Sequence, residues 1–160
     1  TSRDSVVAPD QRIWVSGQFC IHRHVGAGSL KRAGLSVDFI HLAAQSLLGR
    51  VYPSIAVPLF GLLWTSGSWK LMFGSFPSGP FTGVDFGLCC LLMEGHWTLL
   101  TWTVLGSFDQ RFQVHVEFWD GFAPRKAPPC VLALVDFFMT SWTADCVSCE
   151  IGRASCRERV

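Results

Sequence analysis

The sequence predicts an all-β protein: an antiparallel β-sandwich with one short helix near residues 36–48. Three observations support this fold class. Apolar and polar residues alternate with a period of two over much of the chain, which is the pattern of half-buried strands. Short segments rich in Gly, Pro and Ser interrupt these runs, and one stretch has the 3.6-residue period of a helix. Many short strands joined by turns favour a two-layer β-structure.

The clearest strand pair is a predicted hairpin. Residues Arg111–Trp119 alternate strictly, and the preceding segment Trp97–Leu105 is rich in residues that suit strands. Residues 106–110 separate the two runs as a hairpin loop. We expect one face of the second strand to be buried against an opposite sheet and the other, with His115 and Trp119, to be exposed. The residues expected on the buried face are Phe112, Val114, Val116 and Phe118.

Four further stretches are predicted to be strands, because they alternate or form short apolar runs bounded by turn residues. These are Arg12–His24 (one strand or two), Gly67–Phe73, Val84–Leu92 and Cys130–Phe138. The segment Ser75–Pro80 is predicted to be a turn-rich connection. No internal repeat, low-complexity tract or charge run is present.

One helix is predicted over Ser36–Leu48. Ser36 suits the N-cap, and Asp38 in the first turn suits the positive end of the helix dipole. Gly49 is expected to end the helix, and Pro53 blocks its continuation. The residues expected to face inward are Phe39, Ile40, Ala43, Leu47 and Leu48.

The sequence of the C-terminal segment Glu150–Val160 indicates that this segment has a different origin from residues 1–149. With one codon chosen for each residue, Ile151–Val160 resembles a sequencing adapter that has been read through and translated. We therefore expect a single β-rich domain over residues 1–149, and a tail over 150–160 that packs against nothing. The chain begins at Thr1 and its first Met is Met72, so we expect a fragment open at both ends.

The charge and the composition limit the possible functions. Of 13 basic residues the tail holds three, and of 12 acidic residues it holds two, which leaves ten of each in residues 1–149. This neutral balance argues against an electrostatic nucleic-acid binder. The sequence has no Asn and few Lys and Tyr, which indicates nucleotide bias. A spurious or wrong reading frame with no function is therefore one alternative hypothesis.

A small membrane protein is a second alternative, although a membrane-spanning role is not favoured. Val51–Trp64 is apolar but short and carries two Pro residues, and Phe86–Leu105 is interrupted near its middle by Glu94–His96. A transmembrane helix needs about 20 largely uncharged apolar residues.

The motifs that could carry chemistry are each better explained without a function. Cys146 and Cys149 form a C-x-x-C that lacks the further ligands a structural zinc needs. His22 and His24 would share one strand face, but no other ligand follows at a suitable spacing. We predict no catalytic, cofactor-binding or metal-binding residue. The same reasoning makes Glu94-Gly95-His96 a polar turn and Gly26-Ala27-Gly28 a glycine turn.

Several aromatic residues could mark a protein contact or a ligand platform, or else a sheet face covered by another layer. Trp119 lies on the polar face of its predicted strand. The other tryptophans near it in sequence are Trp64, Trp69, Trp97 and Trp102.

The order of these features resembles the jelly-roll capsid domain of picorna-like viruses over residues 12–138. The segments that carry the resemblance are Arg12–Val15, Gly28–Leu30, Leu62–Leu71, Ser78–Gly83, Phe112–Trp119 and Ala127–Val135. The resemblance implies a jelly-roll sandwich and a structural role: a subunit that associates with copies of itself or with related subunits to form a virion shell. It implies no enzyme activity, no cofactor and no small-molecule substrate.

Overall fold

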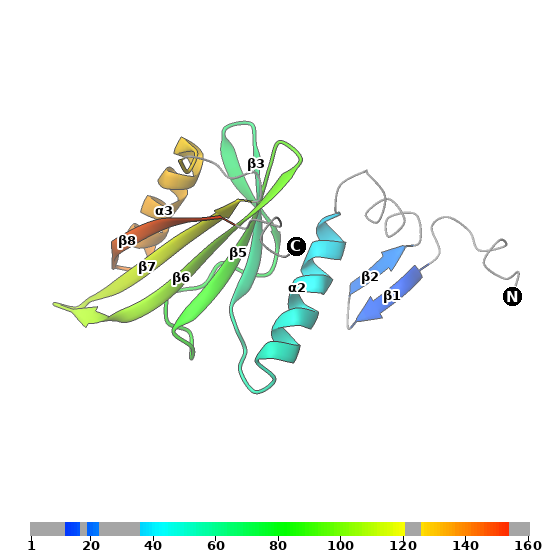
Figure 1. Cartoon of the computed structure of the whole chain (residues 1–160), viewed down its shortest axis with the longest axis horizontal. Helices are drawn as coiled ribbons and strands as arrows, with labels where there is room; N and C mark the ends of the chain where they lie inside the picture. Colours follow the sequence, from blue (N-terminus) through cyan, green and yellow to red (C-terminus); the bar gives the residue numbers. More distant parts are fainter. Residues whose placement is uncertain (1–11, 17–18, 23–35, 121–125, 154–160) are drawn as a thin grey trace, which may run out of the picture. The chain divides into compact units, whose positions relative to one another are not determined.

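The computed structural model describes residues 12–16, 19–22, 36–120 and 126–153, and for 12–16, 19–22 and 151–153 only the backbone. The chain forms two compact units, residues 1–53 and 54–160. We expected one domain over residues 1–149, so the division after residue 53 is a difference from that expectation. Figure 1 labels the elements of both units.

The first unit contains a two-stranded antiparallel sheet and a helix. Strands β1 (Arg12–Ser16) and β2 (Phe19–His22) pair with each other, so the predicted strand region over Arg12–His24 is confirmed as two strands in its described part. Helix α2 (Val37–Val51) confirms the predicted helix. The Ser36 hydroxyl accepts a hydrogen bond from the amide N–H of Phe39 at 3.2 Å, which is the expected N-cap.

Two details of α2 differ from the prediction. The helix continues through Gly49 to Val51, where the N–H of Tyr52 donates to the carbonyl of Leu48. A solvent-exposed Gly costs a helix only about 1 kcal/mol, so it does not have to end one. The most buried residues are His41 and Leu42, whereas Leu47, predicted to face inward, is 61% exposed. The other residues predicted to face inward, Phe39, Ile40, Ala43 and Leu48, are half-buried, so the apolar stripe marked the buried face of this helix only in part.

The second unit is built on a six-stranded mixed sheet in the order β4-β3-β5-β6-β7-β8. Its strands are β3 (Leu59–Thr65), β4 (Ser68–Phe73), β5 (Phe86–Met93), β6 (His96–Phe108), β7 (Arg111–Asp120) and β8 (Ala144–Arg153). The β-rich prediction is confirmed. The β3–β5 and β7–β8 pairs are parallel, however, so the sheet is not purely antiparallel as predicted.

The predicted hairpin is confirmed as β6 and β7. Its turn is tighter than the predicted loop over residues 106–110, because pairing continues to Phe108 and Arg111. Asp109 and Gln110 have φ values of 53° and 64°, as a two-residue hairpin turn with matching twist requires. Alternation along β7 is also confirmed: Val114, Val116 and Phe118 are buried, and Phe112 is partly buried. His115 and Trp119 are only partly exposed rather than fully exposed.

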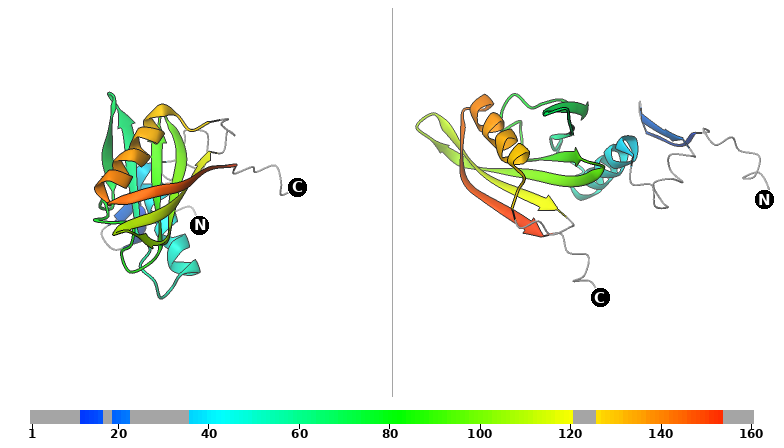
Figure 2. Two further views of the ribbon diagram at one scale, coloured as in Figure 1. Left: turned by 90° about the vertical axis from the view of Figure 1, so that its left-hand side faces the viewer. Right: turned by 90° about the horizontal axis from the view of Figure 1, so that it is seen from above.

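The layer opposite the sheet is a helix, which corrects the prediction of a strand at Cys130–Phe138. Helix α3 (Pro129–Ser141) begins with Pro at its first position, where the missing N–H is not needed. Figures 1 and 2 show α3 across one face of the sheet. Its buried residues recur at helical spacing: Val131, Leu134, Val135, Phe138 and Met139. They pack with side chains of that sheet face, including Phe60, Leu91 and Leu100.

Strands β3 and β8 were not predicted. β3 comes from the apolar segment that raised the membrane hypothesis, and the described residues contain no helix long and apolar enough to cross a bilayer. β8 runs through the expected start of the tail: Glu150 pairs with Glu117, and pairing continues to Arg153 opposite Asp120. Residues 150–153 are therefore part of the sheet, whereas we expected them to lie outside the fold.

Candidate functional site

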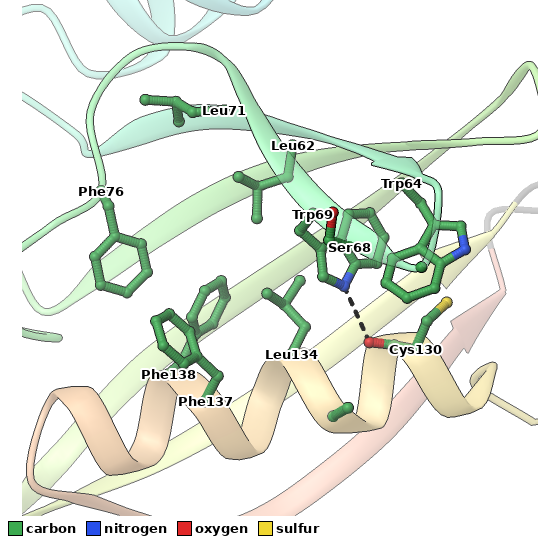
Figure 3. Close-up of a pocket in the computed structure, with 12 residues that line it drawn as sticks. Leu62, Trp64, Ser68, Trp69, Leu71, Phe76, Cys130, Leu134, Phe137 and Phe138 are labelled. Atoms are coloured by element: carbon green, nitrogen blue, oxygen red, sulfur yellow. Dashed lines mark hydrogen bonds between the residues drawn. The ribbon is translucent and has the colours of Figure 1, made fainter.

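An apolar groove of the second unit lies between α3 and the β3–β4 hairpin and has a volume of about 670 Å³. Figure 3 shows its side chains, which come from both strands, the following segment and α3. They are almost all aromatic or aliphatic. The groove residues are Leu62, Trp64, Gly67, Ser68, Trp69, Leu71, Phe76, Cys130, Ala133, Leu134, Phe137 and Phe138.

One end of the groove is fixed by a tryptophan pair. Trp64 and Trp69 lie opposite each other across the β3–β4 hairpin, with ring centroids 5.1 Å apart. The turn between them has positive φ at Ser66 and Gly67, which lets two residues reverse the chain. The Trp69 indole Nε1 donates a hydrogen bond to the Cys130 carbonyl at 3.2 Å, so β4 is tied to the first turn of α3 (Figure 3).

The other end is closed by stacked aromatic rings. Trp142 stacks on Phe138 at 5.0 Å and on Phe76 at 5.7 Å between ring centroids. The Trp142 Nε1 donates to the Pro77 carbonyl at 2.9 Å, and the Trp102 Nε1 donates to the Pro80 carbonyl at 2.9 Å. Both indole donors thus hold the predicted turn segment in place, and the groove has preformed walls.

The groove offers apolar contact and little acid–base chemistry. Its single titratable side chain is Cys130, and burial raises the pKa of that thiol. The rim is open to solvent at Leu71, which is 51% exposed, and at Phe137, which is 58% exposed. A concave apolar surface with exposed aromatic edges is typical of a binding or association site.

Comparison of the sequence with protein-family models found no match, and comparisons with curated proteins and with solved structures found none either.

A second exposed apolar feature lies at the tip of the β6–β7 hairpin. Phe108 is 75% exposed and Leu105 is 60% exposed. Leu105 sits in a β-bulge, where the register shifts between Val104 and Gly106. A bulge turns a side chain out of the regular alternation, which is why period-two reasoning did not single out this residue.

The Glu94-Gly95-His96 motif is a turn, as predicted. Glu94 and Gly95 form the β5–β6 turn with φ values of 52° and 74°. The His96 Nε2 lies 2.6 Å from an Asp120 carboxylate oxygen at the end of β7. The acid beside this imidazole is therefore a residue distant in sequence, and no pattern within the motif indicated it.

The C-x-x-C motif lies in β8, at a bulge that places both cysteines on the same side of the strand. Cys146 is opposite Val114 and Cys149 is opposite Val116, both on the sheet face that carries α3. Burial raises the pKa of both thiols. The described residues bring no His to this pair. The His22 side chain, His24 and the Gly26–Gly28 turn lie outside what the structure describes.

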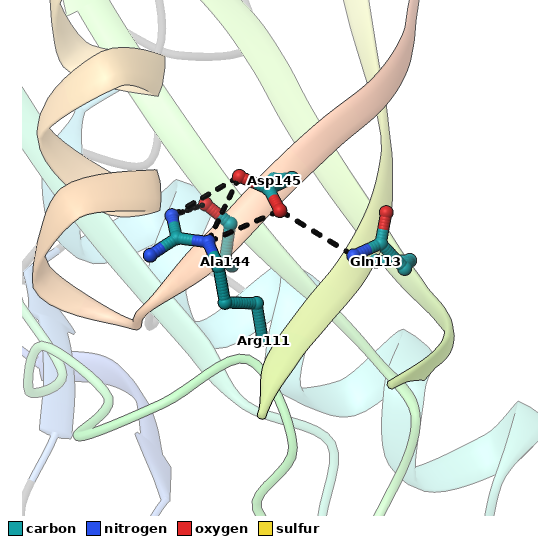
Figure 4. A network of polar contacts seen from close by, with 4 residues as sticks. All are labelled: Arg111, Gln113, Ala144 and Asp145. Atoms are coloured by element: carbon teal, nitrogen blue, oxygen red, sulfur yellow. Dashed lines mark hydrogen bonds and ion pairs between the residues drawn. The ribbon is translucent and has the colours of Figure 1, made fainter. Parts of the chain in front are cut away.

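At the opening of the β7–β8 pair, Arg111 and Asp145 form a surface ion pair (Figure 4). The Arg111 Nε donates to both Asp145 carboxylate oxygens at 3.1 Å, and Nη2 donates to the Ala144 carbonyl at 3.0 Å. The hydrogen bond from Arg111 lowers the pKa of Asp145, and the reverse interaction raises the pKa of Arg111. The group joins the starts of two parallel strands.

The structure places the tryptophans that were expected to form one platform at different sites. Trp64 and Trp69 line the groove, whereas Trp102 is buried under α3 and Trp119 donates a long hydrogen bond of 3.4 Å to the Thr101 hydroxyl. The sequence therefore indicated the aromatic residues on the β3–β4 side of the groove but not those on its α3 side. The α3 side was missed because Phe137 and Leu134 were assigned to a strand.

Proposed function

We propose that this chain is a non-catalytic structural subunit that associates with copies of itself, the hairpin tip of one copy entering the apolar groove of the next. The supporting observation is that one unit carries both an open apolar groove and a separate exposed apolar knob, Phe108 with Leu105. Because knob and groove are different surfaces, this contact is head-to-tail. Such contacts form rings when the rotation closes and filaments when it does not.

The energetics predict weak association from a single contact. Fully burying one Phe side chain contributes about 1.5–3 kcal/mol. Loss of translational and rotational freedom costs about 4–15 kcal/mol. The Phe108 ring alone is therefore insufficient, and the rim residues Leu71 and Phe137 must also be covered. We expect a concentration-dependent equilibrium rather than a permanent dimer.

The virus-capsid form of this proposal rests on the order of sequence features. A jelly-roll sandwich needs a second sheet against the first, and on one face of the six-stranded sheet that position holds α3. Shell assembly is a further step beyond pairwise association. Closed particles in electron micrographs of the concentrated protein would support it, and open filaments or dimers would favour association without a shell.

The test is sedimentation velocity of the full chain and three variants over a wide concentration range. Phe108→Ser removes the knob and Phe137→Ser removes the groove rim, so each is expected to stay monomeric. Leu132→Ser is the matched control, because Leu132 is a 49% exposed residue of α3 that does not line the groove. It should associate as the unaltered chain does.

Mixing the two monomeric variants makes the test specific. Phe108→Ser retains an intact groove and Phe137→Ser retains an intact knob, so their mixture should form a heterodimer and no larger species. An unaltered chain that stays monomeric up to its solubility limit would overturn self-association. Association that survives both substitutions would overturn this interface.

A further inference from the structure

A three-residue polar cluster lies on the β7–β8 pair. His115 and Glu117 are two residues apart on β7, so they share the face opposite the buried Val114 and Val116. Glu150 on β8 is directly opposite Glu117. One ligand atom from each residue lies within 4.8 Å of the others, and the His115 Nε2 is 2.9 Å from a Glu117 carboxylate oxygen.

The bulge in β8 is what completes this cluster. Val147 is an extra residue, so that Val114 pairs with Cys146 but His115 pairs with Ser148. In a regular register Cys149 would lie opposite Glu117, and Glu150 would point to the apolar face. Bulges commonly re-aim side chains beside functional sites. Here the bulge brings Ser148 and Glu150 to the side of His115.

The surroundings of the imidazole are compatible with a ligand role for Nε2. The His115 Nδ1 is in contact with the Ser148 hydroxyl. When Nδ1–H donates to that oxygen, the Nε2 lone pair is directed to the side of Glu117 and can bind a cation; in the other tautomer Nε2–H donates to the Glu117 carboxylate. Metal-binding histidines characteristically have their second ring nitrogen fixed in this way.

The two carboxylates are like charges held close together. Glu117 and Glu150 are a directly paired set of like charges on neighbouring strands, which is destabilising by itself. Among the described side chains, neither forms an ion pair with Lys or Arg. A bound cation would offset both charges at once and would hold the edge strand β8 to β7.

We propose that His115, Glu117 and Glu150 form a binding site for a divalent transition-metal ion, with zinc as the best-matched ion. Imidazole nitrogen and carboxylate oxygen are both zinc ligands, and three protein ligands leave a coordination position open to water. The ion would stabilise the β7–β8 edge. This role is independent of the proposed association through the groove, because none of its ligands lines that groove.

The test is titration of the metal-free full chain with zinc, followed by calorimetry and by X-ray absorption of the loaded protein. Glu117→Gln and Glu150→Gln preserve side-chain shape, and each is expected to weaken zinc binding about tenfold or more. Glu94→Gln controls for loss of a surface charge elsewhere. The double variant Cys146→Ser/Cys149→Ser controls for zinc binding by the C-x-x-C, and both controls should bind as the unaltered chain does.

The absorption spectrum separates the two possible ligand sets. The proposed site gives a first shell of nitrogen and oxygen at about 2.0–2.2 Å, whereas cysteine binding gives sulfur at about 2.3 Å. Sulfur in the first shell, no zinc binding by the unaltered chain, or unchanged affinity in both Gln variants would each overturn the proposal. Circular dichroism checks that every variant is folded. If one of the two Gln variants does not fold, the other is sufficient to decide.

Discussion

The indole N–H of Trp69 donates a hydrogen bond to the carbonyl of Cys130 across a gap of 3.2 Å. This bond joins the edge strand β4 to the first turn of α3, two elements that face each other across the groove. It also satisfies a tryptophan donor whose ring is partly buried. The width of the groove at this end therefore depends on one polar contact between otherwise apolar walls.

Replacement of Trp69 by Phe tests that dependence. The ring stays aromatic but the donor is lost, so we expect a destabilisation of about 1 kcal/mol and faster amide exchange along β4. Urea unfolding and hydrogen exchange measure the two effects. Trp119→Phe is the matched control, because its indole hydrogen bond to Thr101 is longer at 3.4 Å. An equal loss in both variants would contradict a special role for the Trp69 bond.

A second prediction concerns the packing of β5 against β6. A Cβ at Gly87 would lie only 2.0 Å from the Trp102 ring, which is buried and hydrogen-bonded to Pro80 and cannot easily move. We expect Gly87→Ala to destabilise the protein by about 1–3 kcal/mol in thermal or urea unfolding. Gly79→Ala serves as control, because a Cβ there meets nothing within 4 Å. A stable Gly87→Ala protein would show that the Trp102 ring can be displaced.

Local patterns were sufficient where the structure itself is local. The Ser36 cap and the period-two alternation of Val114, Val116 and Phe118 each describe one segment, and both are confirmed. For α3 the sequence held the correct signals, since Pro129 is typical of a helix start and Val131, Leu134 and Val135 have helical spacing. A nearly continuous apolar run also suits a buried strand, so the helical spacing could not be distinguished within it.

The groove and the polar cluster could not be predicted in the same way. Trp69 meets Cys130 and Glu117 meets Glu150 only through pairings of segments distant in sequence. The parallel β7–β8 pairing requires α3 as its crossover connection. Because α3 was predicted to be a strand, β8 was not predicted either. The bulge at Val147 adds a shift of one residue that alternation alone does not reveal.

The Arg111–Asp145 pair gives a pH-dependent prediction. The pKa of Asp145 is lowered in the folded state by its hydrogen bonds with Arg111, so the ionised carboxylate favours folding. The stabilisation is fully present above the unfolded pKa of about 3.9 and is lost as the pH falls through the lower folded value. Asp145→Asn should therefore lower the urea midpoint at neutral pH and have no effect at strongly acidic pH.

Salt provides the control for this prediction. Both side chains are largely exposed, so concentrated salt should shrink the difference between the unaltered chain and Asp145→Asn. A difference that persists unchanged in concentrated salt, or that grows as the pH falls, would indicate that Asp145 acts through packing rather than charge.

The last prediction concerns the order in which the cysteines react. Cys89 and Cys90 point to opposite faces of β5, yet both are buried. Burial raises the pKa of Cys90 to about 11 and the pKa of Cys89 well above its usual value, which leaves almost no thiolate at neutral pH. Cys149 is exposed on the edge strand β8. Among the five cysteines whose side chains the structure describes, we expect iodoacetamide to modify Cys149 first and to leave Cys89 and Cys90 unmodified while the sheet is intact.

Mass spectrometry of peptides from a labelling time course measures this order. Adding urea before the reagent should bring Cys89 and Cys90 to the rate of Cys149, because unfolding removes both the burial and the pKa shift. A Cys149→Ser variant identifies its peptide without disturbing the buried pair. Rapid labelling of Cys90 in the native protein would mean that the face of β5 opposite α3 opens to solvent, and that the sheet is less tightly held than its hydrogen-bonded register implies.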